Sequence, residues 1–276
     1  MGTEEIPVIR RARGYRLYDR EGRRYLDLSR DGGGALLGHR SGSSVAEMKS
    51  ALSQGLSTAA PSVWEARLVR MIAGMFPTHS AVRLFSSRAR ALEAVSCWVG
   101  QRILPVDVHD PALGLPQPTP PLASLWRPLV PGWDSGPGGH DSAAILPVLP
   151  MTICGAPAPV CFAGHPERPV PDSDRLPGFL LAGALSGLVQ LKRADDHLSV
   201  SPAVLRAIDS AAGWARVGPY VRATFRPEAF SGVFHAFLDA GVLLAPEYPG
   251  PSVLPGACSP GETSLLARLF SSIPGG

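Results

Sequence analysis

A pair of serines beside two arginines is the first feature of the sequence that could do chemistry. Ser86 and Ser87 precede a run of helix-forming residues that contains Arg88 and Arg90. The free amides at a helix N-terminus attract anions, and hydroxyl and guanidinium groups add hydrogen bonds and positive charge. Two interpretations follow: these four residues form an anion or phosphate site, or they form a simple N-cap with solvated arginines.

Lysine, whose amine can form a Schiff base with a carbonyl compound, occurs only at positions 49 and 192. Lys49 lies among residues with helical spacing, and Lys192 lies in a charged cluster at the end of another predicted helix. Both contexts are typical of a solvated lysine on a helix surface. Neither lysine is therefore a credible Schiff-base residue.

The other reactive residue types are scattered. The seven histidines lack the paired spacing of zinc ligands, and the four cysteines contain no CxxC pair. We expect reduced, mostly buried thiols and no metal site. His109 and Asp110, like residues 139 to 142, place triad residue types side by side, but no GxSxG motif accompanies them. The glycines at 32 to 34 lack the order of a dinucleotide-binding fingerprint.

Composition indicates a globular protein of 276 residues with 45% hydrophobic and 18% charged residues, long enough for one large domain with a satellite or for two modest domains. Its 30 glycines and 29 prolines predict many loops. The net charge of +3 is spread along the chain, without the basic and aromatic runs of a nucleic-acid surface. No apolar stretch has the length of about 18 residues that a membrane span needs, and residues 1 to 10 carry acids. We expect a cytoplasmic protein with no nucleic-acid or membrane partner.

Hydrophobic periodicity predicts a mixture of strands and helices. Ser62 and Glu65 predict a capping box at the start of a second helix. In the first third we expect a β-hairpin over residues 15 to 28 with a turn at 19 to 22, helices through 45 to 52 and 62 to 76, a strand over 81 to 85, and a helix over 89 to 99.

Prolines dominate residues 103 to 141, so we expect a long and largely irregular connection there. Beyond it we expect strands over 143 to 148, 221 to 225 and 242 to 245, helices over 179 to 191 and 230 to 238, and a last helix capped by Ser259 and Glu262. Such mixing indicates an α/β or α+β fold.

Four motifs in the first hundred residues resemble class III aminotransferases. Residues 14 to 28 match the pattern G-x-x-L-Y-D-x-x-G-x-x-Y-L-D, and residues 37 to 40 match the start of L-G-H-x-H-P. Residues 55 to 65 resemble the segment G-x-S-F-G-A-P-T-x-x-E of glutamate-1-semialdehyde aminomutases, and residues 82 to 87 fall on the strand that leads to the phosphate loop. The order and spacing follow the family.

The C-terminal part carries a further likeness. Residues 241 to 246 resemble the strand G-V-x-L-A-P, and Cys258 stands where the family has a histidine. The resemblance implies a truncated fold type I, class α/β, with a small α+β domain from both termini and a reduced cofactor-type domain. We expect domain boundaries at 1 to 60, 61 to 200 and 201 to 276.

The resemblance also implies a pyridoxal phosphate (PLP) site, and its key residues have no counterpart. Met151, give or take a position, stands where the family has its lysine. The pyridine carboxylate belongs to a region that is missing, and the phosphate turn N-S-G-T-E has become residues 86 to 90. The segment that reaches the partner subunit's phosphate has no match around residues 176 to 178. No catalytic residue and no covalently bound cofactor are expected.

The resemblance leads to two hypotheses about function. The first is a pseudoenzyme without aminotransferase activity that acts as a homodimer, or as a heterodimer with an intact aminotransferase. The second is an enzyme or binding protein that still holds PLP or another phosphorylated ligand non-covalently through Ser86, Ser87, Arg88 and Arg90. A product without selected function is a third interpretation.

Overall fold

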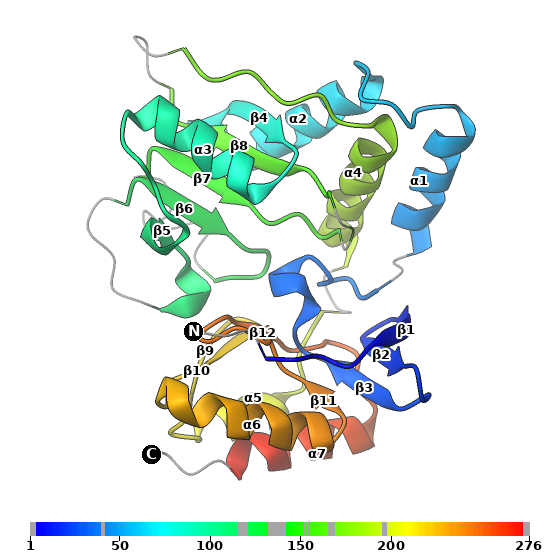
Figure 1. The fold of residues 1–276 in the computed structure, drawn as a ribbon, viewed down its shortest axis with the longest axis vertical. Coiled ribbons are helices and arrows are strands. Elements are labelled where there is room, and N and C mark those ends of the chain that lie inside the picture. The colour runs from blue at the N-terminus through cyan, green and yellow to red at the C-terminus, as the bar shows by residue number, and fades with distance from the viewer. Residues whose placement is uncertain are drawn as a thin grey trace. The chain divides into compact units, whose positions relative to one another are not determined.

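The computed structural model describes residues 4–39, 42–114, 121–131, 142–151, 153, 155–164, 169–194 and 198–272. The chain forms two compact units (Figure 1). The terminal unit comprises Met1–Arg40, Ala112–Gly114 and Lys192–Gly276, and the central unit comprises Ser41–Pro111 and Leu115–Leu191. Among the described residues, no helix combines the length and the hydrophobicity needed to cross a membrane.

Within its described residues, the terminal unit combines two small sheets with three α-helices. Its first sheet has the order β1-β2-β3-β11, in which β11 is parallel to β3, and its second has the order β12-β10-β9. The strands are β1 (Ile9–Arg13), β2 (Arg16–Asp19), β3 (Arg24–Asp27), β9 (Trp214–Val217), β10 (Tyr220–Ala223), β11 (Val242–Leu243) and β12 (Ser252–Val253). The helices are α5 (Pro202–Asp209), α6 (Pro227–Asp239) and α7 (Pro260–Ser271). The predicted hairpin is confirmed as β2 and β3, and Gly22 supplies the positive φ of 87° in its turn.

Aromatic side chains fill the core of this unit. The Trp214 ring lies 5.4 Å from the ring of Phe225, 5.8 Å from that of Phe237 and 5.0 Å from that of Phe270. The contacts with Phe225 and Phe270 are edge-to-face and that with Phe237 is tilted. Aromatic contacts at these separations are favourable, and they join strand β9 to helices α6 and α7. The C-terminal segments therefore pack together around one tryptophan.

A partly buried ion pair connects the two ends of the terminal unit. Arg16 on β2 donates to Glu262 on α7, with Nε 2.8 Å from Oε1. Glu262 also accepts from the Ser259 amide while the Ser259 hydroxyl accepts from the Glu262 amide, so the predicted capping box is confirmed. Burial alone would raise the pKa of Glu262, but Arg16 and the Ser259 donors lower it from 4.5 to about 2.

The central unit is a five-stranded sheet covered on both faces. The strand order is β4-β8-β7-β6-β5; β5, β6 and β7 run parallel, and β8 is antiparallel to both β7 and β4. The strands are β4 (Ala81–Phe85), β5 (Val108–His109), β6 (Ala123–Trp126), β7 (Ala144–Pro147) and β8 (Ala158–Phe162), and the helices are α1 (Gly42–Ser53), α2 (Val63–Met75), α3 (Arg88–Val99) and α4 (Gly178–Arg193).

Alternation along these strands separates two hydrophobic clusters. Ile145 and Cys161 face a cluster that includes residues of α2 and α4, whereas Leu146 and Phe162 face a cluster that includes residues of α3. The strand over residues 81 to 85 and the helices over 89 to 99 and 179 to 191 are therefore confirmed. Cys161 is a buried free cysteine, and burial raises the pKa of its thiol, which favours the protonated form.

The predicted irregular connection is wrong in part. The connection over residues 103 to 141 contains the strands β5 and β6, which belong to the central sheet. The proline-free interval between Pro121 and Pro128 leaves room for β6, whose four residues are all buried. Residues 115 to 120 and 132 to 141 lie outside the described part.

The capping box at the second helix does not form. Ser62 is the N-cap of α2, but its hydroxyl makes no capping bond, and the Glu65 amide donates to the Ser62 carbonyl at 3.2 Å instead. The hydroxyl lies against the start of α4, because a Cβ placed on Gly178 would be 3.5 Å from Ser62 Oγ. Packing against another helix has displaced the local cap.

The Arg16 and Glu262 pair predicts how stability depends on pH. Because the folded-state pKa of Glu262 is depressed, its stabilisation is fully present above pH 4.5 and is lost as the pH falls toward 2. Glu262→Gln should lower the free energy of unfolding by about 1–3 kcal/mol at pH 7 and by much less at pH 3, as measured by urea denaturation. An equal loss at both pH values would contradict the assigned ion pair; Glu228→Gln, on the exposed start of α6, is the control.

Candidate functional site

The predicted anion-binding residues lie where strand β4 passes into helix α3. Ser87 is the N-cap of α3, and its hydroxyl accepts a hydrogen bond from the Arg90 amide at 3.2 Å. Ser86, Arg88 and Arg90 are exposed beside it. The structure therefore confirms the N-cap and brings all four predicted residues to one helix end.

A carboxylate of the chain itself occupies this end of the helix. Asp174 Oδ2 accepts from the Ser86 amide at 2.9 Å and from the Ser86 hydroxyl at 2.8 Å, while Oδ1 lies 3.3 Å from an Arg90 guanidinium nitrogen. Arg90 also donates to Glu93 at 2.6 Å. Burial alone would raise the pKa of Asp174, but the Ser86 donors and Arg90 lower it below its ordinary value. Asp174 is thus an internal anion at the helix N-terminus.

Residues 171 to 175, which we call the strap, position this carboxylate. The strap runs along β4, an edge strand of the central sheet. The Asp174 amide donates to the Leu84 carbonyl at 2.9 Å, and the Leu84 amide donates to the Ser173 hydroxyl at 3.1 Å. Arg83 Nε adds a bond to the Pro171 carbonyl at 3.1 Å. Backbone groups that an edge strand leaves free are therefore satisfied by the strap.

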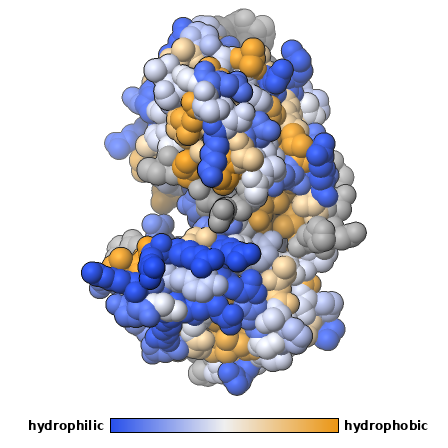
Figure 2. Space-filling model, turned by 90° about the vertical axis from the view of Figure 1, so that its right-hand side faces the viewer, coloured by the Kyte–Doolittle hydropathy of each residue, from blue (hydrophilic) through white to orange (hydrophobic). Residues whose placement is uncertain are grey.

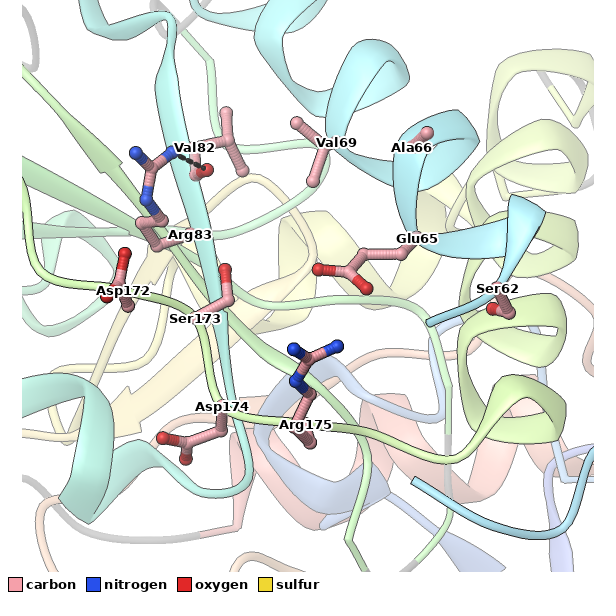
Figure 3. Close-up of a pocket in the computed structure, with 10 residues that line it drawn as sticks. All are labelled: Ser62, Glu65, Ala66, Val69, Val82, Arg83, Asp172, Ser173, Asp174 and Arg175. Carbon is pink, nitrogen blue, oxygen red and sulfur yellow. Dashed lines mark hydrogen bonds between the residues drawn. The ribbon is translucent and has the colours of Figure 1, made fainter. Parts of the chain in front are cut away.

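Between the strap and helix α2 lies an open groove of about 780 Å³ (Figure 3). Figure 3 shows the side chains of Glu65, Ser173 and Arg175 directed into it, whereas Arg83 turns back to the Val82 carbonyl. The groove is lined by Ser62, Glu65, Ala66, Val69, Val82, Arg83, Asp172, Ser173, Asp174 and Arg175. Three carboxylates against two guanidinium groups give this lining a formal charge of −1. Such a balance does not favour a doubly charged phosphate.

The lysines and Met151 lie elsewhere. Met151 is 6% exposed and belongs to the hydrophobic cluster that includes residues of α2 and α4. Lys49 is exposed on α1, and Lys192 is exposed in the last turn of α4. None of the three lines the groove. Across the described residues, no cluster of histidine, cysteine or carboxylate side chains could hold a metal ion.

Sequence reasoning missed the strap. Asp172, Ser173, Asp174 and Arg175 form a short polar run just before α4, which gave a local signal of a polar loop and nothing more. Asp174 meets Ser86 across 88 residues of sequence, so only the fold brings them together. The charge at the helix end could be predicted, but its occupant could not.

A second polar pair lies in the motifs that resemble the aminotransferases. His39 Nε2 is 2.6 Å from Asp27 Oδ2, and the Ser29 amide and hydroxyl donate to the other carboxylate oxygen. Burial would raise the pKa of Asp27, but His39 and Ser29 lower it below its ordinary value. The pair holds the end of β3 against the segment around His39 within the terminal unit.

Sequence comparisons find two kinds of relative. No protein-family profile matches the chain. An uncharacterised protein of Treponema pallidum is 29% identical over 289 residues, which cover 90% of this chain and 88% of that protein. A glutamate-1-semialdehyde 2,1-aminomutase of Desulfosudis oleivorans is 37% identical over 91 residues, which cover 33% of this chain and only 21% of the aminomutase.

Solved structures decide the fold. A transaminase with PLP bound matches with a TM-score of 0.70 at 14% identity, over 98% of this chain and 91% of that one. The chain has the fold of the class III aminotransferases. A glutamate-1-semialdehyde aminomutase of Pseudomonas aeruginosa matches this aminotransferase-fold protein with a TM-score of 0.67 at 12% identity, over 96% of this chain and 86% of that one. The predicted α/β class and fold type I are confirmed.

The internal anion leads to a prediction about Asp174. Asp174→Ala should lower the free energy of unfolding by about 1 kcal/mol, because the Ser86 donors and Arg90 lose their acceptor. Added phosphate should raise the melting temperature of this variant more than that of the wild type, since an external anion can then take the vacated place. Differential scanning fluorimetry measures both effects. Asp172→Ala is the matched control, and an Asp174→Ala variant as stable as the wild type would contradict the assignment.

Proposed function

We propose that this aminotransferase-fold protein is a pseudoenzyme that acts through association, as a homodimer or as a heterodimer with an intact aminotransferase in the cytoplasm. The main support for this proposal is the Asp174 carboxylate, which lies at the N-terminus of α3 where a phosphate would otherwise bind. A fold that has turned this helix end into an internal contact no longer offers it freely to a ligand.

The residues present do not fit PLP. The cofactor requires a lysine for its Schiff base and donors for its phosphate. At the lysine position implied by the resemblance stands Met151, which is buried among apolar side chains. A phosphate at Ser86 would meet the Asp174 carboxylate there, and like charges at such a distance repel. No step of transamination is therefore assigned to this chain.

The association rests on the family resemblance. Class III enzymes work as dimers whose sites are built from both chains, and the chain retains motifs at both termini. Glutamate-1-semialdehyde aminomutase is the family branch that the motifs favour, and it is the natural candidate for a heteromeric partner. Association would then trap a partner subunit or adjust its activity.

The alternative is a protein that binds PLP or another phosphorylated ligand non-covalently at Ser86, Ser87, Arg88 and Arg90. The exposure of Arg88 in the first turn of α3, beside the Ser87 cap, favours this alternative. This alternative requires that a ligand displace Asp174. It would be supported if calorimetric titration of the wild-type chain with PLP or inorganic phosphate gave a saturable heat that Arg88→Ala abolished and Arg70→Ala did not.

Mixing experiments test the proposed function. The purified chain should form a homodimer, or a defined complex with an intact glutamate-1-semialdehyde aminomutase from the same organism, as measured by light scattering coupled to size-exclusion chromatography. Where the mixed complex forms, the aminomutase activity should change in proportion to the fraction bound. A chain that stays monomeric and leaves the enzyme unbound, or that transaminates by itself, would show the proposal to be wrong.

A further inference from the structure

One surface of the terminal unit carries a concentration of arginine. Seven arginines lie between residues 9 and 24, in strands β1, β2 and β3 and the turn that joins β2 to β3. Six of them are exposed: Arg10, Arg11, Arg13, Arg20, Arg23 and Arg24. Over the same residues Glu21 is the only exposed acid, since Asp19 is buried. Figure 2 views the side on which Figure 1 labels β1 and β2, and shows a continuous hydrophilic surface on this unit.

The strand register gathers several of these charges on one face. Arg11 pairs with Tyr18, which pairs with Arg24, and Arg13 pairs with Arg16. Leu17 and Tyr25, directly opposite each other, point to the other face and into the core. We call Arg11, Arg13, Arg16, Tyr18 and Arg24 the arginine face.

Most of the positive charge on and around this face is unneutralised. Arg16 is held by Glu262, and Arg24 lies 3.9 Å from the same carboxylate. Arg11 stacks over the Tyr18 ring at 5.5 Å. Arg10, Arg13 and Arg20 have no ion-pair partner among the described residues. The surface is therefore complementary to acidic groups.

Strand β1 is also an open edge. It is the terminal strand of its sheet, and within the described part of the chain the backbone of Ile9–Arg13 hydrogen bonds only to β2. An edge of five residues has the length of a typical strand. Val8, just before it, is 74% exposed. Unpaired amides and carbonyls on such an edge can pair with an added strand.

We propose that β1 binds an extended acidic segment of a partner protein, which adds a strand to the sheet and places its carboxylates against the arginine face. Acids two residues apart on the added strand would face Arg11 and Arg13, which have the same spacing. This inference deepens the proposed function, since it names the chemistry of a partner.

Charge and hydrogen bonding together select this partner. A second copy of the chain, paired edge to edge through β1, would set arginine against arginine, which is unfavourable. Nucleic acid or an anionic membrane could use the guanidinium groups, but neither can pair with the amides and carbonyls of a strand edge. Only an acidic polypeptide uses both features.

The test uses the full chain and a labelled ten-residue peptide of alternating glutamate and threonine. Fluorescence anisotropy should show saturable binding that weakens with salt, and hydrogen exchange should slow at residues 10 to 12. A peptide with lysine in place of glutamate, and one with N-methylated backbone amides at alternate positions, should both bind at least about tenfold more weakly.

Matched variants separate the arginine face from general charge. Arg11→Glu with Arg13→Glu should weaken binding by about tenfold or more, whereas Arg226→Glu with Arg268→Glu, which reverses two exposed arginines of the same unit, should leave it within about twofold. Equal losses in both double variants, unchanged exchange at residues 10 to 12, or tighter binding to single-stranded DNA or anionic vesicles than to the peptide would overturn the inference. The inference would also be wrong if the wild type does not bind the peptide while the Arg11→Glu, Arg13→Glu variant self-associates. The arginines would then serve only to prevent pairing between copies of the chain.

The proposed function is tested separately. If the peptide does not bind but the complex with the aminomutase still forms, this inference is wrong and the proposed function stands.

Discussion

The free edge of strand β4 is the constraint on which the candidate site depends. An edge strand leaves backbone amides and carbonyls that need partners, and the strap supplies them to Leu84 through the Asp174 amide and the Ser173 hydroxyl. Once the strap lies along β4, the Asp174 side chain reaches the N-terminus of α3 and satisfies the Ser86 donors. The same path forms one wall of the groove facing α2. The same segment therefore covers the edge of β4 and places a carboxylate at the N-terminus of α3.

The terminal unit depends on long-range contacts of a comparable kind. Arg16 near the N-terminus holds Glu262 in the last helix, and that carboxylate is also part of the cap of α7. The aromatic cluster around Trp214 joins the C-terminal helices to the second sheet. These contacts preserve the segments whose motifs resemble class III aminotransferases, although the middle of the chain is short. Retention of this packing is compatible with the interaction role proposed for the chain.

Local patterns predicted much of the fold, because the hairpin, β4, the N-cap of α3 and the capping box of α7 involve neighbours in sequence. Prolines concealed β5 and β6, since a four-residue strand between two prolines has too little length for its period to stand out. The cap at Ser62 was overridden by packing against α4. Residues 86 to 90 were enough to predict the helix N-terminus and its arginines. The position of Asp174 could not be predicted from the sequence, because only the fold brings it next to Ser86.

We propose that the chain keeps the aminotransferase fold without the means to hold PLP covalently. The most direct measurement is to incubate the purified protein with PLP, reduce it with borohydride, and map modified lysines by peptide mass spectrometry. We expect no stoichiometric adduct, and only the trace labelling of Lys49 and Lys192 that an unrelated protein with exposed lysines also shows. Stoichiometric modification of either lysine alone would show that the chain does hold PLP through a Schiff base.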